Sequence, residues 1–250
     1  MRNLRYCSQT ETSTQDIAKN LAPLPDETCM ETVYTFCQRQ GRGQRGNAWF
    51  CGENTNIAAT FVFDPVFLSA EHLFFLDMAL SVGVLRYARS QGEDFFLKWP
   101  NDLYWKNKKA AGLLLENTVV SGKVKRVCFG IGLNVNQAVF PPGLPRPVSL
   151  FQIDGNRRDL QVEIEKLAES IHAAYGEFRR EYKDGILQNI KAEYLESLLF
   201  KDRWRNFVYL GNRMEACIRN VNENGHLELE KRNGGNILAG IKELQYCFDE

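Results

Sequence analysis

The chain has 250 residues, 44% of them hydrophobic, which suffices for a substantial core without disulfides or structural metals. Its 31 basic and 31 acidic side chains cancel, which excludes a strong overall field for nucleic acid or an anionic membrane. The seven cysteines stand singly, no apolar signal segment opens the chain, and no stretch approaches the roughly 20 apolar residues that cross a bilayer. These features predict a soluble, cytoplasmic protein with reduced thiols.

The first half of the chain alternates short apolar runs with one helical pattern. Residues 70–90 repeat apolar side chains at helical spacing, and Ser69 is placed to cap this helix. Apolar or alternating runs predict strands at 33–38, 57–63, 95–99, 103–105, 110–116 and 124–133. This order, with a helix followed by several strands, favours an α+β fold with a mixed or antiparallel sheet over strict βαβ repetition.

The second half opens with two helices and ends in short strands. Residues 160–182 form a long amphipathic pattern, and a second short helix is expected to reach Ser197. Beyond Phe200, brief alternating segments surround turns at Gly211, Gly225 and Gly234, which predicts a small β-barrel or sandwich of roughly 50 residues. The expected division is therefore a main domain at 1–199 and a small domain at 200–250.

The segment from Gln38 to Trp49 is rich in glycine and arginine. Its glycines free the backbone to wrap a ligand, and its arginines supply fixed positive charge, a combination that suits a phosphate or carboxylate. Three of the glycines also match the spacing of a dinucleotide-binding fingerprint, but no helical signal follows them, so that interpretation is weak. An exposed surface turn remains the alternative.

Lys98 closes an apolar run and is followed by a turn. A lysine at the end of a buried strand would be partly desolvated and would interact strongly with an anion. Pro100 stops the strand and can aim Asn101 and Asp102 into a cleft. The alternative is a strand-ending turn whose lysine reaches solvent.

Three further segments combine small or polar residues with predicted strand or helix ends. Residues 109–116 and 130–136 carry glycines within or after apolar strands, which permit close approach of a ligand or merely tight packing. Ser13 precedes a short helical pattern, so its hydroxyl could cap that helix or donate to a ligand.

The order of these five segments resembles the catalytic domain of biotin protein ligases, by motif from Tyr6 to Asn136. The resemblance implies a fold like that of class II aminoacyl-tRNA synthetases, with a C-terminal SH3-like barrel. It also implies an ATP- and Mg²⁺-dependent enzyme that forms biotinyl-5'-AMP and transfers biotin to a lysine of a biotin carboxyl carrier protein.

The same resemblance implies roles for individual residues, with Lys98, Arg42 and Arg45 as the catalytic cations and no metal ligands from the protein. Biotin would be contacted by Ser13, Thr14, Gln15, Gln38, Gly41, Arg42, Lys98, Gly112 and Gly132. ATP or the adenylate would be contacted by Arg42, Gly43, Gln44, Arg45, Gly46, Trp49, Asn101, Asp102 and Asn134.

Two positions depart from the family pattern. Gln15 stands where many members carry asparagine, and Gln44 stands where a well-known variant of the loop has arginine, so the role of that arginine does not carry over. The catalytic motifs begin by residue 13, so no N-terminal helix-turn-helix and no binding to DNA are expected. A homodimer remains open, and no membrane partner is expected.

The proposed chemistry explains the need for cations. Adenylation brings two anions together, and like unit charges about 4 Å apart repel by about 1 kcal/mol in water and about 4 kcal/mol at an effective dielectric of 20. Lys98, Arg42, Arg45 and Mg²⁺ would offset this repulsion, and no enzyme nucleophile is required. The loop from Gly41 to Trp49, whose arginines lack an obvious protein partner, would then order over the adenylate and exclude water.

Two other functions compete with this hypothesis. A lipoate or octanoyl ligase or transferase would share the fold and attach a different acyl group, but its usual loop and histidine are not seen. A non-enzymatic biotin or nucleotide sensor would keep the site and regulate a partner. The combination of a lysine and an anion-binding loop argues against the sensor.

Overall fold

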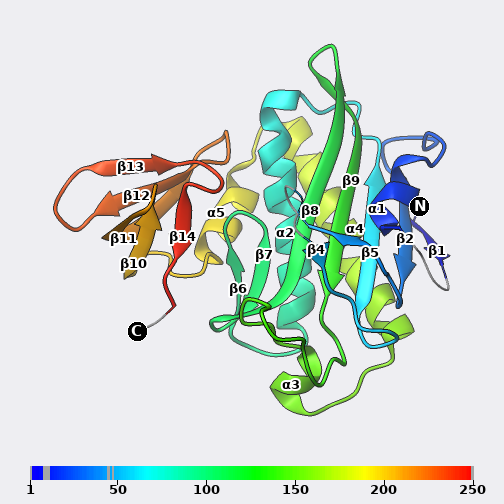
Figure 1. Cartoon of the computed structure of the whole chain (residues 1–250). Coiled ribbons are helices and arrows are strands. Elements are labelled where there is room, and N and C mark those ends of the chain that lie inside the picture. Colours follow the sequence, from blue (N-terminus) through cyan, green and yellow to red (C-terminus); the bar gives the residue numbers. More distant parts are fainter. Residues whose placement is uncertain (1, 8–11, 44–45, 47, 249–250) are drawn as a thin grey trace.

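The computed structural model describes residues 2–7, 12–43, 46 and 48–248. It contains a seven-stranded sheet, a five-stranded sheet near the C-terminus and a two-stranded ribbon (Figure 1). No helix in the described part of the chain is long and apolar enough to cross a membrane.

The seven-stranded sheet has the order β1-β2-β5-β9-β8-β7-β6. β1 pairs with β2 in parallel and every other neighbouring pair is antiparallel, so the sheet is mixed. Its strands are β1 (Arg2–Tyr6), β2 (Met30–Thr35), β5 (Ile57–Phe63), β6 (Phe95–Lys98), β7 (Asp102–Trp105), β8 (Lys108–Val120) and β9 (Lys123–Leu133). The expected α+β fold is therefore confirmed.

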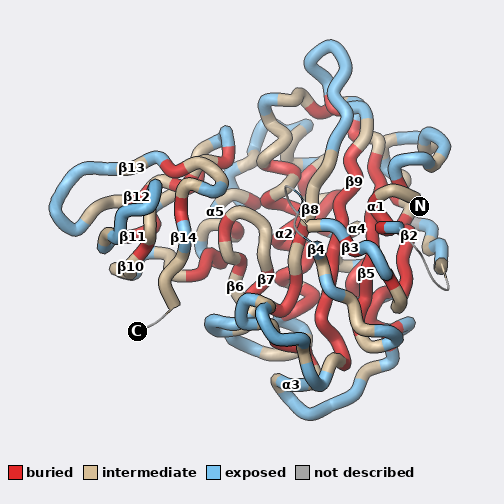
Figure 2. Tube along the Cα trace, viewed as in Figure 1, coloured by how far each residue is buried: buried red, intermediate tan, exposed pale blue. Residues whose placement is uncertain are grey.

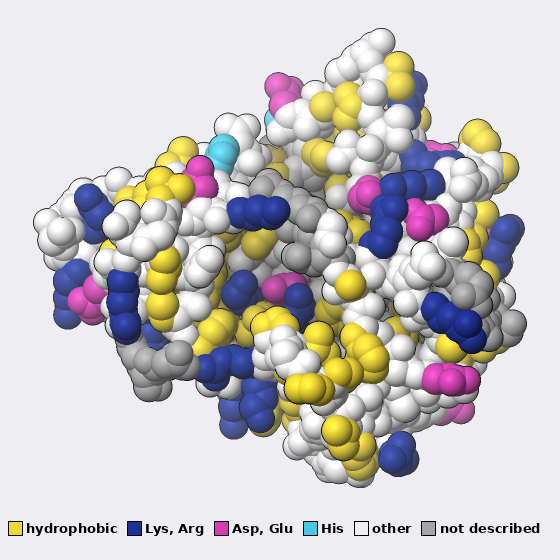
Figure 3. All heavy atoms as spheres, in the orientation of Figure 1, with side chains coloured by type: hydrophobic (Ala, Val, Ile, Leu, Met, Phe, Trp, Pro, Cys, Tyr) yellow, Lys and Arg dark blue, Asp and Glu magenta, His cyan; other side chains and the backbone are white. Residues whose placement is uncertain are grey.

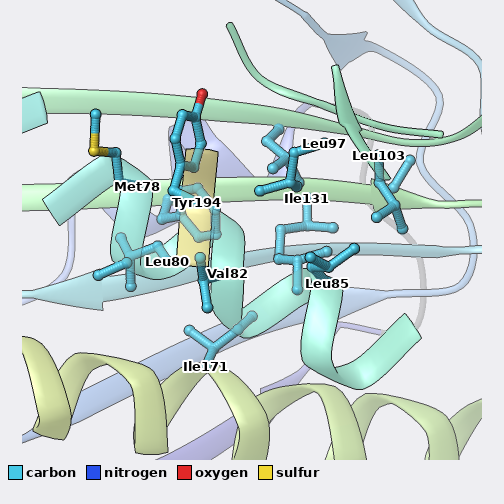
Figure 4. Close-up of a cluster of buried hydrophobic side chains, with 14 of the residues drawn as sticks. Met78, Leu80, Val82, Leu85, Leu97, Leu103, Ile131, Ile171 and Tyr194 are labelled. Atoms are coloured by element: carbon cyan, nitrogen blue, oxygen red, sulfur yellow. The ribbon is translucent and has the colours of Figure 1, made fainter. Parts of the chain in front are cut away.

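Three helices cover one face of this sheet. They are α2 (Leu73–Arg89), α4 (Leu160–Asp184) and α5 (Gln188–Glu196), and α2 contacts both of the others. Figure 4 shows side chains of α2 between Ile131 of the sheet and Ile171 of α4. The buried segments shown in Figure 2 follow the central strands and α2, so the main core lies between the sheet and these helices.

The opposite face of the sheet carries a smaller apolar cluster beneath α1 (Thr14–Lys19). Ala18 of this helix packs with Val33, Val62 and Cys128 of the sheet, while Phe61, Phe63 and Phe129 belong to the main core. Because successive side chains of a strand point to opposite faces, β5 and β9 supply both clusters. α1 covers only part of its face and leaves room for a site.

The C-terminal sheet is antiparallel throughout, with the order β13-β12-β11-β10-β14. Its strands are β10 (Trp204–Tyr209), β11 (Asn212–Val221), β12 (Leu227–Lys231), β13 (Asn236–Ala239) and β14 (Leu244–Tyr246). The buried Trp99 ties it to the larger sheet by donating its indole N–H to the carbonyl oxygen of Gly225, at 2.9 Å. β13 and β14 lie at the two edges of this order, so closure into a barrel stays a prediction.

Several element boundaries differ from the expectation. β2 ends at Thr35 and not at Gln38, because the Thr35 hydroxyl accepts a hydrogen bond from the N–H of Cys37 and turns the chain. Ser69 begins the 3₁₀ turn η2 (Ala70–His72) without a side-chain cap bond, and His72 occupies the N-cap position of α2. β1 and the short helix α3 (Leu150–Asp154) were not predicted, since β1 is polar and is held by backbone pairing with β2.

Candidate functional site

A cavity of about 250 Å³ lies on the face of the seven-stranded sheet that carries α1. Its walls come from the N-terminus of α1, from the ribbon of β3 (Gly41–Arg42) and β4 (Ala48–Trp49), and from the turn that begins β7. Ile241 and Lys242, between β13 and β14, close its remaining side. Figure 3 shows a hollow in this part of the surface with basic and acidic side chains inside it.

The floor of the cavity consists of small residues in register on three adjacent strands. Ala58 of β5 pairs with Gly132 of β9, which pairs with Gly112 of β8. In the next row, two residues along, Thr60 pairs with Gly130. Because alternate residues share a face, these small residues expose the strand backbone to the cavity, whereas their neighbours fill the core.

One end of the cavity is polar and almost completely buried. Ser13 caps α1 by accepting from the N–H of Gln15, at 3.2 Å. The N–H of Thr14 donates to the Oε1 atom of Gln38 at 2.8 Å, and the hydroxyls of Thr14 and Thr60 lie 2.9 Å apart. This network fixes hydroxyl and amide groups before any ligand arrives, which is the arrangement needed to recognise a polar head group.

Gln15 acts mainly within this network. Its amide nitrogen donates to the carbonyl oxygens of Leu114 and Cys128, at 3.2 and 3.0 Å, and its Oε1 atom accepts from Thr60 at 2.8 Å. An added Cβ at Gly130 would lie only 2.7 Å from that Oε1 atom. Both amide hydrogens are therefore committed to protein atoms, and Gln15 holds α1 against the sheet.

Trp49 lies over the glycines of the floor. A Cβ at Gly132 would lie 2.1 Å from its indole ring, and a Cβ at Gly112 would lie 2.8 Å from it. The indole N–H is buried and has no hydrogen-bond partner among the described residues. Trp49 therefore walls the cavity.

Arg42 differs from the expectation that the arginines of this loop lack a protein partner. Its guanidinium contacts Asp16 at 2.7 Å and both carboxylate oxygens of Glu116 at 3.0 Å, while the side chain stays 42% exposed. That expectation is wrong for Arg42, because α1 and β8 each bring a carboxylate beside the ribbon. Gln44 and Arg45 lie outside the described residues, and Gly41 and Gly46 lie beside the cavity and do not line it.

Lys98 ends β6 as predicted, but it is not among the residues that line this cavity. Its ammonium lies 4.6 Å from the ring centroid of Tyr246 and 5.6 Å from that of Tyr104, with the Asp102 carboxylate at 3.9 Å. Burial lowers the pKa of Lys98, an effect that Asp102 opposes and Lys109 reinforces. The cation thus faces the C-terminal sheet.

Asn101 and Asp102 do line the cavity, at the turn after the buried Trp99. The Asn101 side chain donates to the carbonyl oxygen of Leu113, which ties the turn to β8. Asp102 forms an ion pair with Lys109, whose Nζ atom lies 2.6 Å from its Oδ1 atom. The carboxylate therefore lies between two lysines.

A second cavity of about 340 Å³ adjoins the first. Its walls are mostly apolar and include Phe50, Phe140, Leu144, Pro145 and Pro147. Asn134 also lines it and donates its side-chain amide to the carbonyl oxygen of Val148 at 3.2 Å, which anchors the proline-rich segment to the sheet. An apolar slot of this kind suits a flat ring such as a purine.

The structure gathers most of the predicted site residues. The first cavity is lined by Ser13, Thr14, Gln15, Gln38, Arg42, Gly43, Trp49, Asn101, Asp102, Gly112 and Gly132, and Asn134 lines the second. Sequence reasoning missed Thr60, Gly130 and Lys109 as lining residues. The alternation of small residues along β5 and β9 could have indicated Thr60 and Gly130. Lys109, and also Lys242, which was not predicted either, could only be placed at the cavity by the tertiary structure.

This fold and site define an α+β protein with two adjoining ligand compartments on one sheet face, one ending in fixed polar groups and one apolar. The profile of the Biotin/lipoate A/B protein ligase family matches residues 6–134, slightly more than half of the chain. The chain belongs to this family.

Two curated relatives have related sequences. The bifunctional ligase/repressor BirA of Bacillus subtilis is 25% identical over 207 residues, which cover 82% of this chain and 53% of that protein. The biotin--[acetyl-CoA-carboxylase] ligase of Paracoccus denitrificans is 33% identical over 137 residues, covering 52% of this chain and 57% of that protein. The chain spans about half the length of the curated relatives it matches.

Solved structures share the fold over nearly the whole chain. The biotin protein ligase from Aquifex aeolicus in complex with biotin and ATP has a TM-score of 0.78 and 23% identity, covering 98% of this chain and 99% of that one. The biotin protein ligase from Leishmania major in complex with biotinyl-5-AMP has a TM-score of 0.60, 19% identity, and coverage of 95% and 98%. At these identities the likeness establishes the fold.

Proposed function

We propose that this protein is an ATP-dependent biotin ligase that forms biotinyl-5'-AMP and transfers biotin to a lysine of a biotin carboxyl carrier protein. The observation that carries the proposal is the pair of cavities, one polar-ended with a glycine floor and one apolar, which meet at Trp49 and Lys109. Family membership and the biotin and ATP named for the Aquifex structure support it.

Biotin would occupy the first cavity. Ser13, Thr14 and Gln38 form the buried polar end, where hydroxyl and amide groups can pair with the ureido head group of biotin. The floor that contains Gly112 and Gly132 would receive the flat ring system once the indole of Trp49, which lies against both glycines, moves aside. The carboxylate of biotin would then point toward the second cavity.

ATP would place its adenine in the second cavity, beside Trp49 and near Asn134. Magnesium usually binds through substrate phosphates together with only one or two carboxylates, so we propose that Mg²⁺ enters with the triphosphate. Arg42, Gly43, Gly46 and the loop residues Gln44 and Arg45 would lie over the phosphates. In this proposal Arg42 exchanges Asp16 and Glu116 for a phosphate.

The chemistry needs charge compensation and positioning, without a covalent enzyme intermediate. A carboxylate oxygen of biotin attacks the α-phosphorus, and the bond to the β-phosphate oxygen breaks as pyrophosphate leaves with the electron pair. The acceptor lysine, as a neutral amine, then attacks the acyl carbon, loses a proton and expels AMP. Arg42, which lines the first cavity, would offset the negative charge that develops in these steps. The catalytic role proposed for Lys98 requires its ammonium to leave Tyr246 and turn toward the cavity when the substrates bind.

The remaining expectations concern organisation and partners. We propose that residues 1–199 form the catalytic unit and residues 200–250 a small unit of the SH3-like barrel type. Ile241 and Lys242 reach the first cavity, so the small unit would also touch the bound substrate. A carrier protein that offers its lysine at this opening, and a homodimer of the ligase, complete the proposal.

The test is exchange of radiolabelled pyrophosphate into ATP by the purified protein, with biotin, lipoate or octanoate as the acid. We expect exchange with biotin, followed by transfer of biotin to a carrier domain with an intact acceptor lysine and none to a Lys→Arg version. Exchange with lipoate or octanoate but not biotin would replace the proposal with the rival ligase. Tight biotin binding without exchange would support the sensor.

A further inference from the structure

We infer that Cys37 and Cys51 form a reversible disulfide beside the first cavity, a modification site that restrains Trp49 over the glycine floor. Cys37 directly precedes Gln38, and Cys51 lies two residues after Trp49. Gln38 and Trp49 both line the cavity, whereas neither thiol has a part in the binding or the chemistry proposed above. Formation of the bond does not depend on the proposed function, but its effect on biotin binding rests on that function.

The two cysteines lie on neighbouring antiparallel stretches of chain. The N–H of Asn54 donates to the carbonyl oxygen of Phe36 at 2.8 Å, and further along Gly41 of β3 pairs with Trp49 of β4. Cys37 and Cys51 lie between these two connections, one on each stretch. In this register the two cysteines are diagonal neighbours on the same side, so a small approach of the two stretches suffices to join them.

The sulfur of Cys51 is directed toward the stretch that carries Cys37. It accepts a hydrogen bond from the N–H of Gln38, and the two thiols are close enough to interact electrostatically. Burial raises the pKa of the Cys51 thiol to about 11, a rise that this hydrogen bond opposes and Cys37 reinforces. Burial also raises the pKa of Cys128 and of Cys217, but the groups that act on those thiols are basic and acidic side chains. Proximity to a second thiol therefore distinguishes Cys51 from these two cysteines.

The backbone holds both cysteines in place before any oxidation. The N–H of Cys37 donates to the hydroxyl oxygen of Thr35, and this hydroxyl donates back to the carbonyl oxygen of Cys37, both at 3.1 Å. Beside Cys51, Gly52 is packed so closely that a Cβ there would lie 2.0 Å from the Oε1 atom of Gln137. Two thiols that are already held near each other lose little freedom when they bond, which favours closure.

The oxidant is a small disulfide such as glutathione disulfide, which can reach the pair because both cysteines are partly exposed. The Cys37 thiolate attacks one sulfur, a mixed disulfide forms, and one glutathione leaves as a thiolate. Because its pKa is raised, Cys51 reacts second: it loses its proton, attacks the Cys37 sulfur and expels the second glutathione. The departing thiolates take up the two protons, so the two protein thiols are oxidised and one glutathione disulfide is reduced to two glutathione molecules.

The bond restrains the wall of the cavity. In the proposed binding mode the indole of Trp49 must leave the floor before biotin enters. To bond, Cys51 must leave the N–H of Gln38 and approach Cys37, which draws the end of β4 against the neighbouring stretch. β4 is then held by its pairing with β3 and by the disulfide, so Trp49 has less freedom to move. A restraint that cuts the open fraction of the protein to about one tenth weakens the apparent affinity for biotin about 10-fold.

The test compares the whole protein after treatment with glutathione disulfide or with dithiothreitol. Peptide mass spectrometry without reduction should show a Cys37–Cys51 cross-link in the oxidised wild type. Calorimetry should show biotin affinity about 10-fold weaker in this form than in the reduced form, with full recovery in dithiothreitol. Cys51→Ser should show no cross-link and should bind biotin like the reduced wild type under both conditions. Cys29→Ser, which removes another partly exposed cysteine, should behave as wild type.

Three results would overturn the inference. The first is absence of the cross-link at concentrations of glutathione disulfide that modify other thiols of the protein. The second is a cross-linked protein that binds biotin as tightly as the reduced form or more tightly. The third is an equal loss of affinity on oxidation of Cys51→Ser, which would place the effect at another cysteine. Cys37→Ser gives the same answers from the other side if Cys51→Ser does not fold. Failure of the proposed function appears separately, as a reduced wild type that does not bind biotin, and the cross-link is still tested by mass spectrometry.

Discussion

The two faces of the seven-stranded sheet are built from the same strands but by opposite rules. Toward the helices β9 presents Phe129 and Ile131, both buried in the main core. Toward the cavity it presents Gly130 and Gly132, where any side chain would collide with Gln15 or Trp49. One face therefore gains stability from its own large side chains, and the other uses glycine so that Gln15 and Trp49 can pack directly on the strand backbone and wall a ligand site.

This difference has a consequence for substitutions. On the helix face, removal of atoms leaves a cavity and lowers the free energy of unfolding. On the cavity face, addition of atoms displaces a wall residue and should alter binding more than stability. The contrast can be tested with substitutions on the helix face and on the cavity face.

The largest effect is expected on the helix face. Phe129→Ala should lower the free energy of unfolding by about 3–5 kcal/mol, because Phe129 is fully buried and its truncation leaves a void that the core cannot close. Urea denaturation followed by circular dichroism measures this. Lys125→Ala, an exposed change on the same strand, should stay within about 0.5 kcal/mol of the wild type. Equal losses in both variants would contradict the assignment of Phe129 to the core.

Two glycine substitutions compare the faces directly. Gly83→Ala in α2 should lower the free energy of unfolding by about 1–3 kcal/mol, because the new Cβ would lie 3.0 Å from the Cβ of Ala174 and force α2 from α4. Gly132→Ala should leave the melting temperature nearly unchanged, since the indole of Trp49 can move. It should slow biotin-dependent exchange by about 100-fold, because a misplaced wall residue misaligns the substrates.

The pair of measurements is denaturation and pyrophosphate exchange on both glycine variants. The comparison of faces predicts a crossed pattern, with stability lost in Gly83→Ala and turnover lost in Gly132→Ala. Normal exchange in a folded Gly132→Ala protein would show that the floor of the cavity does not hold the substrate. A strongly destabilised Gly132→Ala protein would instead show that the packing of Trp49 on Gly132 contributes to the stability of the fold.

The most gradual effect is spread over a range of pH and lies among the helices. Burial raises the pKa of Asp77 in α2 to about 7, and its Oδ1 atom has no hydrogen-bond partner among the described residues. In the unfolded chain an aspartate titrates near pH 4, so between about pH 4 and 7 the folded state keeps a proton that the unfolded state has lost. Stability should therefore fall as pH rises through this window, by up to about 1.4 kcal/mol per pH unit.

Asp77→Asn should flatten that dependence, which urea denaturation at several pH values can measure. Glu223→Gln, which removes an exposed carboxylate from the turn between β11 and β12, is the matched control. If the wild type and Asp77→Asn show the same slope between pH 4 and 7, Asp77 is not a buried proton carrier. If Asp77→Asn is more stable than the wild type at neutral pH and Glu223→Gln is not, burial of the Asp77 carboxylate lowers the free energy of unfolding.

The motif residues of the site were predictable because each forms part of a short segment with a local physical signature. Ser13 precedes a helix that it caps, and Lys98 ends an apolar strand before Pro100. Gly112 and Gly132 stand inside apolar runs, where glycine has a reason only if something approaches the backbone. The α+β class followed from the order of these segments in the same way.

The direction in which the charged side chains point was not predictable. Lys98 turns toward Tyr246, which lies 148 residues further along the chain, and Arg42 is held by Asp16 and Glu116 from two other elements. β8 also contains a bulge, where its pairing with β7 shifts by one residue. Because alternate strand residues share a face, counting back from Gly112 would assign Lys109 to the core face, whereas its side chain lines the cavity. Each of these outcomes depends on long-range pairing.

The sequence by itself therefore determined the fold class, the strands and helices of the main core, and the short motifs from which the site is built, because periodicity and turn chemistry are local properties. The tertiary structure alone decided which strand face stays open, which cation lies between the two cavities and how the C-terminal sheet closes the site. The physical reason is that a cavity and an ion pair are made by groups far apart in the chain, whose meeting depends on sheet register and packing.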